Sequence, residues 1–303
     1  ALVILVHPES LSEDALLALD QYLMRGGKLL CFLDNFSLME GRSKGKKVLS
    51  SSLSEVSTLL GFSEAWGVRY LAKLVLADDD LKAPVRGTKN PFMLQLQRAN
   101  MKSDDKVFQN VNKLYMPYSG FFEYKAREGL TYEKLLMSSS NNMPVKRALA
   151  NDMKSVVKNF KSTNQERILG LRVRGKLPSS FKMDYLNEEQ KKNFVSIGSE
   201  QVEVVLISDA DMLHDSFEMN VQKLFDGRRE RIKISDNTVL FLNLVDEMTR
   251  GGKLLGLRGR RIQDRRFSRK KEVQLTALKK YQTEIDTQQK IYYQKIQEVL
   301  LHP

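Results

Sequence analysis

The sequence predicts an α/β fold built on a parallel sheet, and its first 33 residues carry the clearest signs. Residues 2–6 are a short apolar run rich in β-branched side chains, the pattern of a strand covered on both faces. Residues 28–33 are expected to be a second buried strand, and the residues between the two repeat apolar side chains at helical spacing. A strand, a helix and a strand in this order form a crossover unit, whose two strands are parallel. We therefore expect a sheet with helices on both faces.

The helix between these two strands has recognisable start and stop signals. Ser12 precedes two acidic residues, which suit the positive end of a helix dipole. The apolar positions that follow recur every three or four residues: Leu16, Leu19, Leu23 and Met24. Gly26 and Gly27 are expected to end the helix, and the next strand runs into Asp34.

Length and charge narrow the range of functions. At 303 residues the chain is long for a single core, which predicts one large domain with insertions or two lobes. With 49 basic and 37 acidic residues the net charge is +12, which favours lipid headgroups, nucleic acid or acidic proteins as partners. Cys31 lies in the middle of an apolar run, where a small apolar side chain is expected rather than a nucleophile. No apolar run approaches the ~20 residues that span a bilayer.

Residues 37–80 continue the first part of the domain. The polar, basic stretch 37–52 lacks the glycine pattern of a phosphate-binding loop, so we interpret it as a solvated loop. A short helix is expected over 54–60 and a strand over 68–77. The aspartates at 78–80 form an acidic turn rather than a cation site, because no glycine shapes a loop around an ion.

Residues 81–200 are predicted to be an irregular α+β insertion or a second lobe. Prolines punctuate residues 81–137, in which only 113–118 has the pattern of a strand. Aromatic side chains cluster within ten residues in and after it: Tyr115, Tyr118, Phe121, Phe122 and Tyr124. They could form a stacking surface for a ligand, or pack the segment onto the sheet. Further on we expect a helix within 145–165, a strand over 168–173 and a polar surface insertion over 182–200.

The second informative stretch is residues 202–217, VEVVLISDADMLHDSF. Its apolar half predicts a buried strand, and acidic and imidazole groups follow at the carboxyl end: Asp209, Asp211, His214 and Asp215. Ligands bind at the carboxyl ends of strands in open α/β sheets, and Asp34 could lie on the same edge. These groups could hold a metal ion, or they could cap turns and a following helix.

Residues 201–260 are expected to belong to the α/β domain again, and the residues after them differ in composition from that domain. An apolar helix is expected over 237–248, with Gly251 and Gly252 at its end, and a last short strand over 254–257. Residues 258–271 are very basic, and 272–301 carry a coiled-coil-like apolar seam that predicts a long helix. We therefore treat 261–303 as a basic segment followed by a stalk helix.

One run, SLSEDALLALDQYLMRGGKLLCFLDNFS, resembles the extracytoplasmic domain of the GldG-like family, a gliding-motility auxiliary component of ABC transporters. Its features are an acid-capped helix with a Leu-Asp-Gln-Tyr core, then Gly-Gly-Lys and a strand that ends in Asp. Later stretches fit the family in the same order: residues 53–62, KLYMPYSGFFE, LTYEKLLMSSSNNM, LGLRVRGKLPSSF, and VVLISDADMLHDSF followed by FLNLVDEMTRGGKLLGLRGRR. The resemblance spans nearly the whole chain.

This resemblance implies a bacterial protein anchored in the inner membrane, with its soluble domain in the periplasm. It also implies an ABC permease and an ATPase as partners, and a role in gliding or surface export. The implied fold is Rossmann-like, similar to class I glutamine amidotransferases and to the GIFT-type domain of an intraflagellar transport protein. No enzymatic activity and no cofactor are implied. The amidotransferase Cys–His pairing has no counterpart here, because Cys31 is mid-strand and the three histidines have no evident partner. A chain that begins inside a strand leads us to expect an excised soluble part.

We therefore expect a non-catalytic accessory domain that binds a partner protein or an exported protein or polysaccharide. The expected contact surface combines strand-end acids with aromatic residues: Asp34, Asp209, Asp211, Tyr115, Tyr118 and Phe121. A second hypothesis is a metal-dependent hydrolase that uses Asp209, Asp211 and His214. A third is a nucleic-acid binder, which the charge permits but no recognition motif supports.

Overall fold

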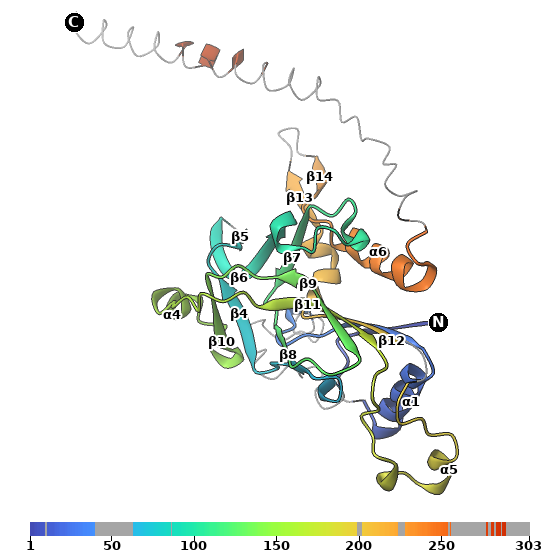
Figure 1. The fold of residues 1–303 in the computed structure, drawn as a ribbon. Helices are drawn as coiled ribbons and strands as arrows, with labels where there is room; N and C mark the ends of the chain where they lie inside the picture. The colour runs from blue at the N-terminus through green and yellow to red at the C-terminus, as the bar shows by residue number, and fades with distance from the viewer. Residues whose placement is uncertain are drawn as a thin grey trace, which may run out of the picture. The chain divides into compact units, whose positions relative to one another are not determined.

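The computed structural model describes most of the first 255 residues and a few residues near the end of the chain (Figure 1). The described residues are 1–9, 11–39, 63–85, 87–198, 202–223, 228–253, 255, 277, 280–281, 283–285 and 287–288. The chain divides into two compact units, Ala1–Leu257 and Arg258–Pro303. The described residues of the second unit are helical, but most of the helix predicted over 272–301 lies outside the described residues, as do the basic run 258–271 and the helix predicted over 54–60.

The first unit is built around a seven-stranded sheet. Its strands are β1 (Leu2–Val6), β2 (Lys28–Phe32), β12 (Val202–Ile207), β11 (Ile168–Gly175), β8 (Phe122–Tyr124) and β3 (Val68–Tyr70) in that order, with β9 (Leu130–Met137) also paired to β11. β1, β2 and β12 are parallel, as the opening crossover unit predicts. The remaining pairs are antiparallel, so the prediction of a parallel sheet is wrong beyond these three strands. An apolar run indicates that a strand is buried, but it does not indicate in which direction the neighbouring strand runs.

Two helices cover opposite faces of the parallel part of the sheet (Figure 1). α1 (Glu13–Met24) packs Leu23 and Met24 against the face that carries Leu29 and Cys31. Its N-cap is the predicted Ser12, whose side chain accepts a hydrogen bond from the N–H of Ala15. The apolar face of α6 (Asn237–Arg250) covers the other side of the sheet.

At the end of α6, one prediction from the sequence is confirmed and another is wrong. Gly251 ends the helix in a left-handed conformation with φ 63°, as its position predicts. The short strand predicted over 254–257 is wrong at Leu255, which is helical and buried beside the helix end. The other residues of that range lie outside the described part of the chain.

The first strand is not covered on both faces. Ile4 is 38% exposed and Val6 is 51% exposed. β1 is the edge strand of the sheet, and within the described residues it pairs only with β2. The apolar run therefore predicts the strand correctly but overestimates its burial, because coverage depends on which elements reach that edge.

Residues 81–137 are largely strands, which corrects the prediction of an irregular insertion. β5 (Lys82–Val85), β6 (Thr88–Gln97) and β7 (Lys113–Pro117) form a three-stranded antiparallel sheet. β5 and β6 are not predicted from the sequence because prolines usually interrupt strands. Here Pro84 lies on an edge strand, and Pro91 lies where the register of β6 shifts against β5. Both are positions at which a strand tolerates proline.

The strand predicted over 68–77 is two strands in different sheets. Its first part is β3, and its second is β4 (Leu74–Asp78), which pairs with β10 (Asn142–Lys146). The helix predicted within 145–165 is only the short α4 (Met153–Lys158). The polar insertion 182–200 contains α5 (Glu188–Lys191), and a separate ribbon consists of β13 (Met219–Lys223) and β14 (Arg229–Lys233). Short 3-10 helices occur at Arg98–Asn100, Lys106–Phe108, Arg147–Leu149, Met183–Tyr185, Asp211–Leu213 and Asp215–Phe217.

A buried arginine joins the strands on the α6 side of the sheet. Arg172 on β11 is 2% exposed and pairs with three carboxylates. Its Nη1 lies 3.1 Å from Oε2 of Glu133 on β9, its Nε lies 3.3 Å from Oε1 of Glu203 on β12, and Nη1 also contacts Asp105. Burial works against the charged form, but these carboxylates raise the pKa of Arg172. The arginine is therefore compensated, as a buried charge must be.

Candidate functional site

The three acids predicted at the strand ends lie close together. Asp34 follows β2 and Asp209 follows β12, and these strands are adjacent and parallel, so both carboxyl ends reach the same edge of the sheet. Asp211 begins the turn after β12. All three are buried, however, with exposures of 2%, 1% and 4%. The sequence thus predicts their proximity, but they form an internal cluster rather than an exposed rim.

Each of these carboxylates accepts hydrogen bonds from the turn that follows a strand. Asp34 Oδ1 accepts from the N–H of Phe36 at 2.7 Å, and Asp209 Oδ1 accepts from the N–H of Met212 at 3.1 Å. Asp211 accepts from the N–H of Leu38 at 2.5 Å, and from the N–H of Met39 and the hydroxyl of Ser37. Asp211 thereby joins the turn after β12 to the turn after β2. Capping of turns, one of the two readings of the sequence, accounts for these contacts.

Burial makes the acid cluster electrostatically unusual. Desolvation, reinforced by the neighbouring carboxylates, raises the pKa of Asp34 and of Asp209 well above the ordinary range. Burial also raises the pKa of Asp211, although hydrogen bonds from Leu38, Met39 and Ser37 in the turn after β2 work in the other direction. Within the described residues, Asp209 Oδ2 accepts no hydrogen bond. The cluster therefore retains protons to a higher pH than exposed aspartates do.

Close packing fills the space around the cluster. The phenol of Tyr70 is buried against it, and burial followed by the charges of Asp34 and Asp209 raises its pKa well above the ordinary value. Gly120 approaches so closely that a Cβ there would lie 2.7 Å from both the Tyr70 hydroxyl oxygen and Asn35 Nδ2. The sequence pattern does not predict Tyr70 and Gly120 as neighbours of the acids, and its one relevant signal is the glycine within the aromatic segment.

The predicted aromatic residues mostly pack rather than present a surface. Phe121 is fully buried, with the guanidinium carbon of Arg167 5.4 Å from its ring centroid. Tyr118 stacks between Phe36 and Phe92, at centroid distances of 4.7 Å and 5.1 Å. The packing interpretation therefore holds for these two residues.

Tyr115 and the histidine after β12 have polar contacts of their own. Tyr115 is half-buried, and its hydroxyl lies 3.0 Å from Gln95 Oε1, to which it donates. His214 is exposed, and its Nδ1 accepts a hydrogen bond from the N–H of Ser216 at 3.1 Å, which caps the next short helix. Among the residues that the structure describes, no group of histidine, cysteine and acidic side chains is arranged to hold a metal ion.

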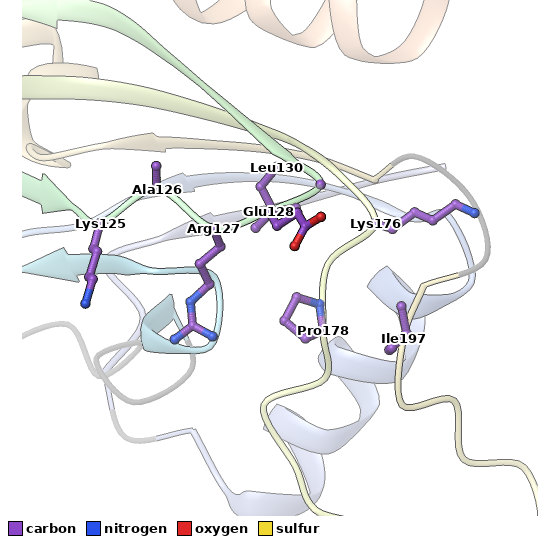
Figure 2. A pocket seen from close by; sticks show the side chains of 9 residues that line it. Lys125, Ala126, Arg127, Glu128, Leu130, Lys176, Pro178 and Ile197 are labelled. Atoms are coloured by element: carbon purple, nitrogen blue, oxygen red, sulfur yellow. The ribbon is translucent and has the colours of Figure 1, made fainter.

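An open cavity of about 630 Å³ lies away from these residues (Figure 2). It is lined by Lys125, Ala126, Arg127, Glu128, Gly129, Leu130, Lys176, Pro178 and Ile197. Arg127 is already engaged, since its Nη2 donates to the carbonyl oxygen of Glu64 at 3.0 Å. In Figure 2 the side chains of Lys125 and Lys176 point away from each other, with Glu128 between them. The cations do not converge, so the cavity does not form an anion site.

Comparison with known proteins gives one match to a family. The model of the family described as "ABC-type uncharacterized transport system" matches residues 1–244. No curated protein matches the chain. Among solved structures, the "mmIFT52 N-terminal domain" is similar, with 10% sequence identity and a TM-score of 0.44, over 82% of this chain and 76% of that one.

Proposed function

Because the chain belongs to the ABC-type uncharacterized transport system family of auxiliary components, we propose that it is a non-catalytic accessory component that binds a partner or a transported substrate. The match over residues 1–244 is the observation that carries this proposal, since it includes every strand that the structure describes. The accessory role in an ABC transport system follows from the family. The absence of catalysis and the identity of the partners belong to the proposal.

The buried acids support binding rather than chemistry. Asp34, Asp209 and Asp211 hold turns together through their hydrogen bonds, and this structural role accounts for them. A catalytic carboxylate must reach its substrate within hydrogen-bonding distance, directly or through one water. The closed packing around Gly120 and Tyr70 leaves the cluster without such access.

The motif resemblance extends the proposal to a GldG-like protein with a GIFT-type fold. In this proposal the domain faces the periplasm of a bacterium, its anchor lies in the inner membrane, and an ABC permease and ATPase are its partners in gliding or export. Within the described residues, no helix is both long enough and apolar enough to cross a bilayer.

Co-purification tests the accessory role directly. The full-length tagged protein is extracted in mild detergent from cells that express it at its natural level, and its partners are identified by mass spectrometry. We expect an ABC permease and an ATPase to be enriched over an extract of untagged cells. Recovery of the protein with neither subunit would contradict the proposal.

Photo-crosslinking tests which surface makes the contact. A benzophenone side chain replaces Tyr115, a half-buried member of the predicted contact surface, in the full-length protein. The matched control replaces Tyr185, another tyrosine, which is 84% exposed. We expect a crosslink to a transporter subunit or substrate from position 115 and none from position 185. Equal crosslinking from both would show that the predicted surface is not the contact.

A further inference from the structure

The ribbon of β13 and β14 stands apart from the sheets of the first unit (Figure 1). Its two strands pair with each other and with no other described strand. In the antiparallel register Val221 lies opposite Arg231, and Lys223 lies opposite Arg229. Residues opposite each other, and residues two apart on one strand, share a face of a ribbon. One face therefore carries Val221, Arg229 and Arg231 together.

The charges on this face are available. Arg229 and Arg231 are exposed, and neither forms an ion pair with an acid among the described residues. Lys233, on the same face, is instead held by Asp236 at 3.1 Å and Glu218 at 3.6 Å. Val221 is 53% exposed. The face thus presents two guanidinium groups beside an exposed apolar side chain. At one end of the same face, Lys233 is held by its ion pairs to Asp236 and Glu218.

We propose that this face of the ribbon docks on the anionic phospholipid headgroups of a membrane surface. A guanidinium group forms bidentate hydrogen bonds with phosphate oxygens, and an apolar side chain beside it gains by entering the interface. The net charge of +12 adds a long-range attraction to such a surface. The proposal rests on the proposed function in one respect, because an accessory component of an ABC transport system works next to the membrane in which the transporter lies.

Headgroup docking fits this face better than nucleic acid or an acidic protein does. A two-stranded ribbon can enter the major groove of DNA, where hydrogen bonds from side chains read the base edges. Here the residue opposite Arg231 is Val221, which offers no hydrogen bond to a base or to a carboxylate. An exposed apolar residue between cations is instead typical of surfaces that lie in the membrane interface.

The test places an environment-sensitive dye on the ribbon of the full chain. The native Cys31 is fully buried, so Val221→Cys provides a single labelling position. The labelled protein is mixed with phosphatidylcholine vesicles with and without phosphatidylglycerol. We expect a blue shift of the dye only with the anionic vesicles, and a loss of that shift as salt rises. The control label is Ile197→Cys, which is 61% exposed and outside the ribbon; it should not respond.

Charge variants then test the arginines themselves. Arg229→Gln with Arg231→Gln should weaken the partition to anionic vesicles about 25-fold at low salt, or roughly 5-fold for each arginine. The control is Arg69→Gln, an exposed arginine on β3 whose loss should leave partition unchanged. Because Arg229 and Arg231 are exposed, the double variant should retain the circular dichroism spectrum and the unfolding midpoint of the parent chain.

Three results would overturn the inference. The vesicles could bind the protein while the dye at 221 stays silent, which would place the contact elsewhere, for example in residues 258–271. The dye could respond equally to uncharged vesicles or to both labelled positions. Duplex DNA or an acidic protein could displace the vesicles and produce the larger shift. None of these results depends on co-purification with transporter subunits, so this inference and the proposed function fail independently.

Discussion

Single residues in this protein show how burial decides the role of an ionisable group. Asp209 follows β12, Asp236 precedes α6, and both accept hydrogen bonds from backbone N–H groups. Nevertheless, the pKa of Asp209 is raised and the pKa of Asp236 is lowered. Desolvation and the charge of Asp34 dominate at Asp209. At Asp236, burial alone would raise the pKa, but hydrogen bonds from Asn112 and Lys113 and the ammonium of Lys233 outweigh it. The two aspartates should therefore affect stability in opposite ways.

We expect Asp209→Asn to raise the free energy of unfolding at pH 7.5, because the substitution removes a carboxylate whose charged form is disfavoured by burial and by the charge of Asp34. The asparagine is neutral, and its Oδ1 can still accept from the N–H of Met212. In the unfolded chain an aspartate releases its proton above about pH 4, whereas an aspartate with a raised pKa keeps its proton in the folded state. The free energy of unfolding therefore falls as the pH rises from the unfolded pKa to the folded pKa. The stabilisation by Asp209→Asn should thus be larger at pH 7.5 than at pH 5, as measured by urea unfolding.

Asp236→Asn is the matched control with the opposite sign. The lowered pKa of Asp236 contributes stability that is present at neutral pH and is lost on acidification through the folded pKa. This variant should therefore destabilise the protein at pH 7.5 and cost less as the pH falls below about 4. If Asp209→Asn were the more destabilising of the two at pH 7.5, the charged form of Asp209 would be the stable one, contrary to the argument from burial.

At the scale of elements, α1 fastens the polar segment that lies between β11 and β12. Asp20 is fully buried, and its carboxylate accepts from the Ser179 hydroxyl at 2.7 Å and from the N–H of Ser180 at 2.8 Å. Gln21 exchanges two hydrogen bonds with the backbone of Val195, at 3.0 Å and 2.8 Å. The segment predicted only as a surface insertion is thus attached at both ends to a helix early in the chain.

Removing one attachment should loosen this segment without unfolding the sheet. We expect Asp20→Ala to cost about 1–3 kcal/mol, because the backbone N–H of Ser180 loses its acceptor in a buried place. Trypsin should then cut faster within 182–192, as followed by mass spectrometry of the early fragments. Glu13→Gln, an exposed change on the first turn of the same helix, is the control and should leave the cleavage rate unchanged. Equal cleavage of both variants would mean that Asp20 does not hold the segment.

At the scale of the whole molecule, the first unit contains every sheet and both long helices that the structure describes. The strands of residues 81–146 belong to the same compact unit as the seven-stranded sheet, and buried residues from both parts share one core. The first unit should therefore fold without the second.

A chain that ends at Leu257 should unfold cooperatively with a midpoint within a few degrees of the full chain, as measured by circular dichroism, since a few degrees corresponds to roughly 1 kcal/mol. The control ends at Ser235 and lacks α6, whose Leu240, Leu244 and Met248 are buried against the sheet. That chain should lose the cooperative transition. If the chain that ends at Leu257 also failed to fold, residues 258–303 would be needed for the stability of the first unit.

The strands, helices and caps that depend on local pattern could be predicted from particular residues. Ser12 and Gly251 mark helix ends through their own backbone chemistry. Residues 29–33 and 204–207 could be predicted as buried strand segments because their apolar runs have no polar break. Asp34 and Asp209 could be expected to be neighbours because parallel strands bring their carboxyl ends together. Pro84 and Pro91 misled the prediction because a proline penalises a strand only where its missing N–H would have been paired.

By itself, then, the amino-acid sequence determines the crossover unit, the acids at the strand ends and the excess of positive charge, since each depends on neighbouring residues or on composition. Only the tertiary structure decides that most of the sheet is antiparallel, that the acids are enclosed and that Phe121 is buried. It also decides that Arg229 and Arg231 are left exposed on a ribbon of their own. Pairing direction and exposure are properties of residues far apart in the chain that come into contact, and no local pattern encodes which of them will meet.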